Sequence, residues 1–170
     1  MHQYIKNYFT KIEKAIINSI STLKPSVEEA YVSGFWLFYC DHTSINPPCF
    51  ALNTNYSDDE EKWSPPEWDI DVIDEVYDAL APIYKELSEY MSSKSDDEWE
   101  ELVEYQFKFY SELCLQYNES MSSEESPFNS WHKSNDFVIG IFEEREDEET
   151  YKELIISSIG SKKASALNII

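Results

Sequence analysis

The spacing of the apolar residues changes repeatedly along the 170-residue chain, and this pattern limits the folds that the chain can adopt. Four stretches repeat apolar residues every three or four positions, as amphipathic helices do. These are residues 2–23, 65–92, 96–117 and 149–159. Three shorter runs are rich in aromatic and β-branched residues, as strands are. These are residues 29–40, 49–55 and 136–143. We therefore expect an α+β fold in which a small, mostly antiparallel sheet of three or four strands packs against four or five amphipathic helices.

Prolines and capping motifs predict where these elements begin and end. Pro25 ends the first helix, and Pro82 is expected to kink or divide the second, because proline lacks the amide that an interior helical position uses. Three Ser-x-x-Glu capping boxes fall within the acidic stretch, beginning at Ser57, Ser64 and Ser95, and each predicts a helix start. No stretch resembles a linker between domains, so residues 1–170 are expected to form a single domain.

The chain is strongly acidic, with a net charge of −21 at pH 7. The charge is uneven, because residues 58–104 hold 18 acidic residues against three lysines, whereas residues 1–27 carry a net charge of +3. Nucleic acids and anionic membranes are therefore not expected as direct partners, since phosphate binding needs lysine and arginine. A cationic partner, or mimicry of a polyanion, is favoured instead.

Two of the expected helices carry a row of carboxylates with the spacing i, i+3, i+4, i+7, which places each row on one helix face. The first row is Asp71, Asp74, Glu75 and Asp78, and the second is Asp97, Glu100, Glu101 and Glu104. Each like-charged pair at i, i+4 costs about 0.2–0.5 kcal/mol of helix stability. The helix dipole offsets this cost only in the first turn. Both rows are therefore candidate docking sites for a basic partner, with a simple solvated face as the alternative interpretation.

Three tryptophans, Trp63, Trp68 and Trp99, each lie beside or within an acidic cluster at an expected helix start. One interpretation is structural: the ring packs the end of the helix onto the core. The other is functional: an aromatic side chain among carboxylates has the composition of a binding hot spot for partners rich in arginine and lysine.

Candidate catalytic and metal-binding residues are few. Cys40 and His42 share one side of an expected strand but Asp41 does not, so a buried structural cysteine is favoured over a nucleophile. A zinc site made of Cys40, His42 and Cys49 lacks a fourth ligand and the usual ligand spacing. The three glycines of the chain form no phosphate-binding loop. We therefore predict no catalytic residues, no metal site, no cofactor and no enzymatic activity.

The sequence also bears on where the protein resides. The longest purely apolar run, FWLFYC, has six residues, against the roughly 20 that span a membrane. The N-terminal residues alternate lysines with apolar residues and contain no secretory signal. Cys40, Cys49 and Cys114 have no regular spacing and do not predict a disulfide framework. A cytoplasmic protein is expected.

The order of the motifs adds a resemblance. An N-terminal helix is followed by FWLFYC, CFALNT, WSPPEW with an acidic helix, and finally NDFVIGIFEER. This order resembles an uncharacterised bacterial domain family common in polymorphic-toxin loci, whose members are thought to act as immunity proteins, as in contact-dependent growth inhibition. The resemblance implies a cytosolic α+β antitoxin that binds the C-terminal domain of a cognate toxin. It brings no catalytic residues.

Three hypotheses for function follow. The leading one is an immunity protein that neutralises a nuclease toxin, because a nuclease needs a cationic cleft and a row of carboxylates is complementary to it. The second is a DNA mimic that inhibits a DNA-binding protein or a restriction enzyme. The third is an acid–base enzyme, which the number of acidic residues neither supports nor excludes.

Overall fold

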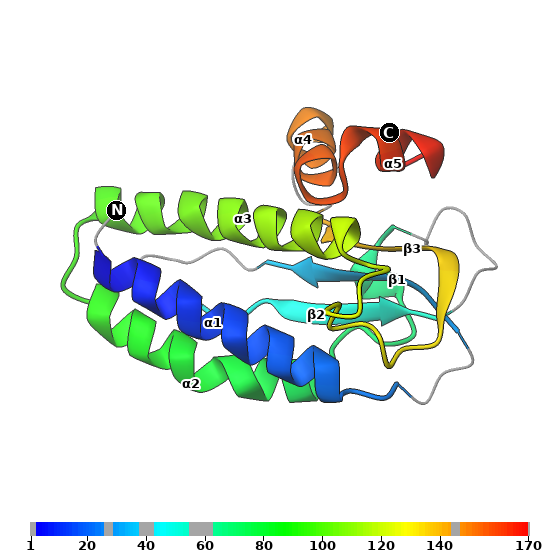
Figure 1. Ribbon diagram of the computed structural model, residues 1–170. Coiled ribbons are helices and arrows are strands. Elements are labelled where there is room, and N and C mark those ends of the chain that lie inside the picture. The colour runs from blue at the N-terminus through cyan, green and yellow to red at the C-terminus, as the bar shows by residue number, and fades with distance from the viewer. Residues whose placement is uncertain (1–2, 26–28, 38–42, 55–62, 144–146, 170) are drawn as a thin grey trace.

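The computed structural model describes residues 3–25, 29–37, 43–54, 63–143 and 147–169 (Figure 1). The elements, in chain order, are α1 (Gln3–Thr22), β1 (Ala30–Trp36), β2 (Cys49–Asn53), the 3₁₀ turn η1 (Pro65–Glu67), α2 (Asp74–Met91), α3 (Asp96–Glu119), β3 (Lys133–Ile141), α4 (Glu148–Ile159) and α5 (Ser161–Ala166). The expected α+β class is confirmed.

The three strands form one sheet in the order β2-β1-β3, with β1 at its centre. β1 pairs with β2 in antiparallel register, from Val32 opposite Asn53 to Trp36 opposite Cys49. β1 pairs with β3 in parallel, with Val32 opposite Val138. The connection from β1 to β3 passes through β2, α2 and α3, and a crossover of this length allows the two strands to pair in parallel.

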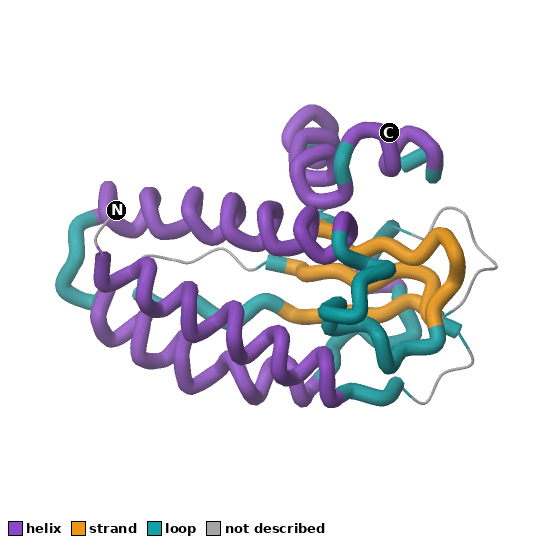
Figure 2. Tube along the Cα trace, in the orientation of Figure 1, coloured by secondary structure: helices purple, strands orange, loops and turns teal. Residues whose placement is uncertain are grey.

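Helices cover both faces of the sheet (Figure 2). The larger core lies on one face, where alternate strand residues such as Phe35, Leu52 and Ile139 pack against α1, α2 and α3. The smaller core lies on the other face, where Val32 and Val138 meet α4 and α5. This alternation is what a strand that is buried on both faces requires.

The expected helix over 65–92 begins later than predicted. Residues 65–67 form only a 3₁₀ turn, and Ser64 makes no side-chain capping hydrogen bond. The chain then runs extended beside β2: the Leu52 amide donates to the Ile70 carbonyl at 2.8 Å, and the Ile73 amide donates to the Phe50 carbonyl at 2.8 Å. These bonds cover the free edge of the sheet, which an exposed strand would otherwise offer to other chains.

α2 therefore begins at Asp74, and it runs through Pro82 to Met91 as one helix rather than two segments. Pro82 is exposed, so the carbonyl that its missing amide leaves unpaired lies on the solvent side of the helix. The capping box at the start of α3 is confirmed, since Ser95 and Glu98 make both of its reciprocal bonds. The capping motif at Ser57 lies outside the described residues.

The last helical region also begins with a cap. The Asp147 carboxylate accepts hydrogen bonds from the amides of Glu149 and Thr150 at the start of α4. Gly160 has φ of 88°, and this left-handed conformation turns the chain between α4 and α5. The tail of the sequence thus continues as a short helix that packs on the smaller core through Ala164.

Candidate partner-binding surface

The second row of carboxylates lies on α3 as predicted. We call Asp97, Glu100, Glu101 and Glu104 the α3 acidic face. All four are exposed, and no hydrogen bond or ion pair to another described residue neutralises any of them. The opposite side of α3 carries Trp99, Leu102 and Tyr110 into the larger core. Packing on one side therefore holds these four carboxylates in one row on the other.

The first row is only partly helical. Asp71 precedes α2, in the segment that runs beside β2, so its place in the expected helix was wrong. Asp74, Glu75 and Asp78, which we call the α2 acidic face, are exposed on the helix itself. Asp74 and Glu75 occupy the first turn, where the helix dipole favours negative charge. The dipole therefore explains most of this row, because only Asp78 lies beyond that turn.

The two acidic faces do not merge into one surface. α2 lies along the lower side of the helical layer in Figure 1 and α3 along its upper side, with α1 between them. Each helix turns its apolar face toward the core and its acidic face away from it.

The tryptophans behave differently from the carboxylates. Trp99 is 1% exposed and belongs to the larger core. Trp68 is 4% exposed and packs edge-on against Phe142, with the two ring centroids 5.5 Å apart. Trp63 is half-buried and stacks on the same Phe142 ring, with the two ring centroids 5.9 Å apart. The structural interpretation accounts for Trp68 and Trp99. Neither exposes the ring surface that a partner contact needs, so the expectation that they anchor a partner is corrected.

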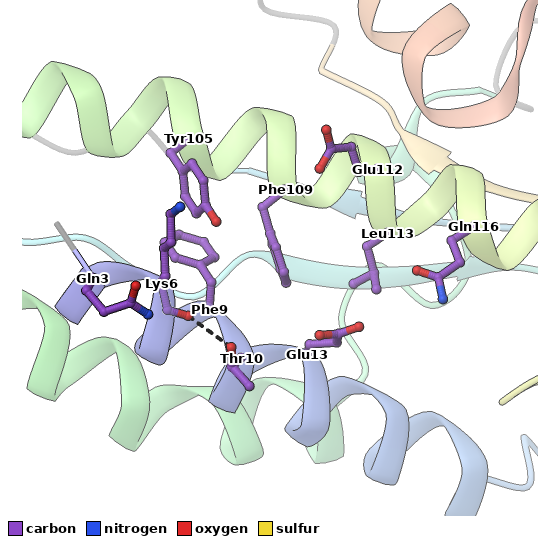
Figure 3. A pocket seen from close by; sticks show the side chains of 10 residues that line it. All are labelled: Gln3, Lys6, Phe9, Thr10, Glu13, Tyr105, Phe109, Glu112, Leu113 and Gln116. Atoms are coloured by element: carbon purple, nitrogen blue, oxygen red, sulfur yellow. Dashed lines mark hydrogen bonds between the residues drawn. The ribbon is translucent and has the colours of Figure 1, made fainter. Parts of the chain in front are cut away.

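An aromatic groove lies between α1 and α3 (Figure 3). It has a volume of about 440 Å³. Phe9 and Leu113 form its buried floor, and Tyr105 and Phe109 are half-buried in its α3 wall. The fully buried side of α3 carries residues 99, 102, 106, 110, 113 and 117. Tyr105 and Phe109 lie at the edge of this side, so they pack only partly on the larger core and border the groove.

The charges of the groove are arranged along its length. Lys6 extends from α1 toward α3 at the end where Tyr105 lies, whereas Glu13 lies toward the other end, below Leu113 in Figure 3. Glu112 lies on the α3 wall and pairs with Lys108 at 3.8 Å, with both side chains well exposed. Burial, and then the Glu112 carboxylate, raises the pKa of Tyr105. The lining of the groove is therefore mostly polar, and it holds Lys6 as well as the two carboxylates.

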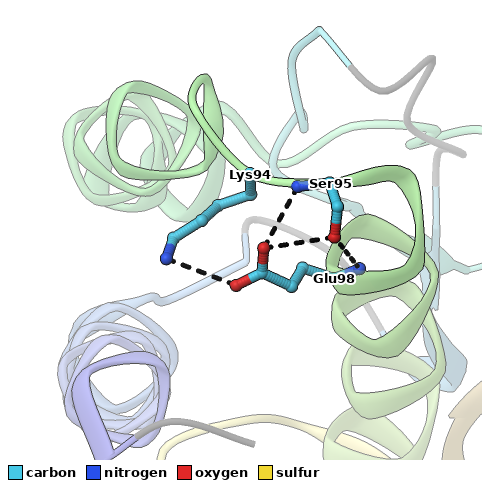
Figure 4. A network of polar contacts seen from close by, with 3 residues as sticks. All are labelled: Lys94, Ser95 and Glu98. Atoms are coloured by element: carbon cyan, nitrogen blue, oxygen red, sulfur yellow. Dashed lines mark hydrogen bonds and ion pairs between the residues drawn. The ribbon is translucent and has the colours of Figure 1, made fainter.

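The start of α3 shows how a carboxylate is neutralised in this protein (Figure 4). The Glu98 carboxylate accepts from the Ser95 amide at 3.1 Å and pairs with Lys94 at 3.3 Å. These two hydrogen bonds lower the pKa of Glu98. The carboxylates of the α3 acidic face have no such partners among the described residues.

Of the residues considered as a nucleophile or as zinc ligands, the structure describes only Cys49. Cys40 and His42 lie outside the described residues. Cys49 is buried, and its pKa is raised by burial and then by Asp71, which suits a structural thiol rather than a nucleophile. Among the residues that the structure describes, no group of three histidine, cysteine, aspartate or glutamate side chains is arranged to hold a metal ion.

Comparison of the sequence with known protein families and curated proteins, and of the fold with solved structures, found no match. No helix in the described part of the chain is both long and apolar enough to cross a membrane.

Proposed function

We propose that this protein is a cytoplasmic immunity protein that binds and neutralises a basic toxin domain, such as a nuclease, through the α3 acidic face. The observation that carries the proposal is the row of four exposed carboxylates on α3, none of them paired with a described cation. The resemblance of the motif order to immunity domains supports the same function.

Physical chemistry gives such a row two uses in binding. Repulsion among the carboxylates raises the free energy of the unbound protein, and cations of a partner relieve it. The field of the row also attracts a basic partner over a long range, and steering of this kind supports association at about 10⁸–10⁹ M⁻¹s⁻¹ at low salt. Fast capture suits an inhibitor whose target does damage while it is free.

The α3 acidic face is the better candidate of the two. Glu100, Glu101 and Glu104 lie beyond the first turn of α3, so the helix dipole does little to stabilise them. The α2 acidic face has only Asp78 in that position. DNA mimicry receives less support, because it needs a long continuous row of charges and the two faces lie on different sides of the helical layer.

The test uses the C-terminal toxin domain that this proposal expects to be encoded directly upstream. Replacing the α3 acidic face by Asn and Gln (D97N, E100Q, E101Q, E104Q) should weaken binding by at least about 2 kcal/mol if the contacts are desolvated. It should also reduce the salt dependence of the association rate. The control is the α2 acidic face variant (D74N, E75Q, D78N), which should retain affinity. The proposal is wrong if the toxin does not bind the wild-type protein, or if the α3 variant binds as tightly as the wild type.

A further inference from the structure

We propose that the groove between α1 and α3 binds a small zwitterion, a free molecule whose carboxylate and ammonium group are separated by a chain of several carbon atoms. Its carboxylate pairs with Lys6, and its ammonium group pairs with Glu13 at the opposite end of the groove. This site is independent of the proposed function, because its lining residues include none of the carboxylates of the α3 acidic face.

The charges at the two ends of the groove have no partners. Among the residues that the structure describes, neither the Lys6 ammonium group nor the Glu13 carboxylate forms a hydrogen bond or an ion pair. Glu112 also lines the groove, but it already pairs with Lys108 at 3.8 Å. The groove therefore holds one unpaired cation and one unpaired carboxylate, and a ligand that carries both charges is complementary to both ends.

The spacing of the two charges determines the length of the ligand. Lys6 and Glu13 lie about two turns apart on α1, or roughly 10 Å along the helix axis. Lys6 extends toward Tyr105, Glu13 lies below Leu113, and the Phe109 ring lies between these two ends (Figure 3). An α-amino acid carries both charged groups on one carbon atom and is too short to reach both ends. An ω-amino acid has a hydrocarbon chain between them, and this chain can lie against Phe109.

The wall that contacts this chain is already formed in the free protein. The Phe9 ring makes edge-on contacts with Tyr105 and with Phe109, with ring centroids 4.8 Å and 4.9 Å apart. These contacts hold the two half-buried rings in place, so a ligand loses little free energy in ordering them. The volume of about 440 Å³ lies in the range of small-molecule pockets, and the mostly polar lining suits a small charged ligand.

The first experiment titrates the protein with 6-aminohexanoate and follows binding by NMR. The dissociation constant should be below about 1 mM. Hexanoate lacks the ammonium group and hexylamine lacks the carboxylate, so each should bind at least tenfold more weakly. The inference is overturned if 6-aminohexanoate does not bind at about 10 mM, or if either analogue binds as tightly.

The second experiment assigns the two charges to the protein. Lys6→Gln and Glu13→Gln should each weaken the binding of 6-aminohexanoate at least tenfold. The control variant K14Q/E89Q removes one cation and one carboxylate at exposed positions outside the groove, and it should bind within twofold of the wild type. Wild-type affinity in Lys6→Gln or Glu13→Gln would place the ligand elsewhere and overturn the inference.

The third experiment fills the groove without removing a charge. Thr10 is exposed and lines the groove, and its hydroxyl donates to the Lys6 carbonyl within α1. Thr10→Trp should abolish the binding of 6-aminohexanoate. Thr22→Trp is the matched control and should bind normally, because Thr22 is an exposed threonine of the same helix that does not line the groove.

A last comparison distinguishes a free molecule from the end of a protein chain. A peptide that ends in lysine also carries a carboxylate and an ammonium group separated by carbon atoms. If such a peptide binds at least tenfold more tightly than 6-aminohexanoate, the groove receives a chain terminus and the inference is overturned. Weaker or equal binding of the peptide supports a free small molecule.

Discussion

At the scale of single residues, three buried tyrosine hydroxyls differ in their hydrogen bonding. The hydroxyls of Tyr84 and Tyr110 share a hydrogen bond of 2.8 Å in the larger core. Tyr117 is only 3% exposed, and its hydroxyl has no hydrogen-bond partner among the described residues. Tyr117→Phe should therefore raise the free energy of unfolding by about 1 kcal/mol, because it removes an unsatisfied polar group. Tyr110→Phe should lower it by about 1–3 kcal/mol, since it leaves the Tyr84 hydroxyl unpaired. Urea unfolding measures both changes, and a destabilised Tyr117→Phe variant would contradict the first.

The same residues predict how stability depends on alkaline pH. Burial raises the pKa values of Tyr84, Tyr110 and Cys114 above those of the unfolded chain. In the unfolded chain a cysteine ionises near pH 8.5 and a tyrosine near pH 10. Above these values the unfolded state binds fewer protons than the native state, so the free energy of unfolding falls as the pH rises. The urea midpoint should be lower at pH 10.5 than at pH 8, and Cys114→Ala should reduce the difference. Equal midpoints would contradict the prediction.

At the scale of elements, the outer edge of β3 is covered by side chains. The Asn118 amide group donates to the Ile139 carbonyl at 2.6 Å, and its oxygen accepts from the Ile139 amide at 3.1 Å. Asn118 thereby takes the place of a neighbouring strand, and the Ser158 hydroxyl accepts from the Ile141 amide at 3.1 Å in the same way.

Asn118→Ala should therefore destabilise the protein by about 1–3 kcal/mol for each buried Ile139 group left unpaired, and it should promote aggregation through the freed edge. Asn129→Ala is a suitable control, because Asn129 is exposed and its side chain donates to the Glu124 carbonyl, which lies in the same loop. Thermal unfolding and light scattering of the two variants test the prediction. A loss in Asn118→Ala no larger than in Asn129→Ala would contradict it.

Periodicity alone predicted most of these elements. The first helix was expected over 2–23 and spans Gln3–Thr22, and the last was expected over 149–159 and spans Glu148–Ile159. In each case one apolar face is buried in a core, so the pattern predicted the face that the structure buries. The late start of α2 was not predictable in this way, because the extended form of residues 70–73 depends on pairing with β2, which is distant in the sequence.

The candidate site was predictable in part. The spacing of the four carboxylates predicted the α3 acidic face, since exposure follows directly from the helical period. The groove was not predicted, because Tyr105 and Phe109 are apolar and fall close to the core face of α3. Their half-buried state depends on where α1 lies. Trp99 shows the reverse error, since its acidic neighbours indicated a surface role and its helical position placed it in the core.

At the scale of the whole molecule, a net charge of −21 opposes folding, because folding brings like charges together. The ion pairs on the surface do little to offset this. Lys11–Glu86 and Lys108–Glu112 are well exposed, and such pairs contribute about 0.2–1 kcal/mol each. Repulsion among the carboxylates should therefore affect stability more than the ion pairs do, and added salt should stabilise the protein by screening that repulsion.

Raising NaCl from low concentration to physiological ionic strength shortens the screening length to about 8 Å, which weakens repulsion between carboxylates on neighbouring turns and elements. The melting temperature should therefore rise with NaCl. The α3 acidic face variant should be more stable than the wild type at low salt, by about 0.2–0.5 kcal/mol for each i, i+4 pair removed, and should gain less from added NaCl. Calorimetric melting of both proteins across a NaCl series measures these effects. A melting temperature that falls with NaCl would show that ion pairs contribute more to stability than repulsion does. Repulsion among the α3 carboxylates would then be too weak to contribute to the binding of a partner.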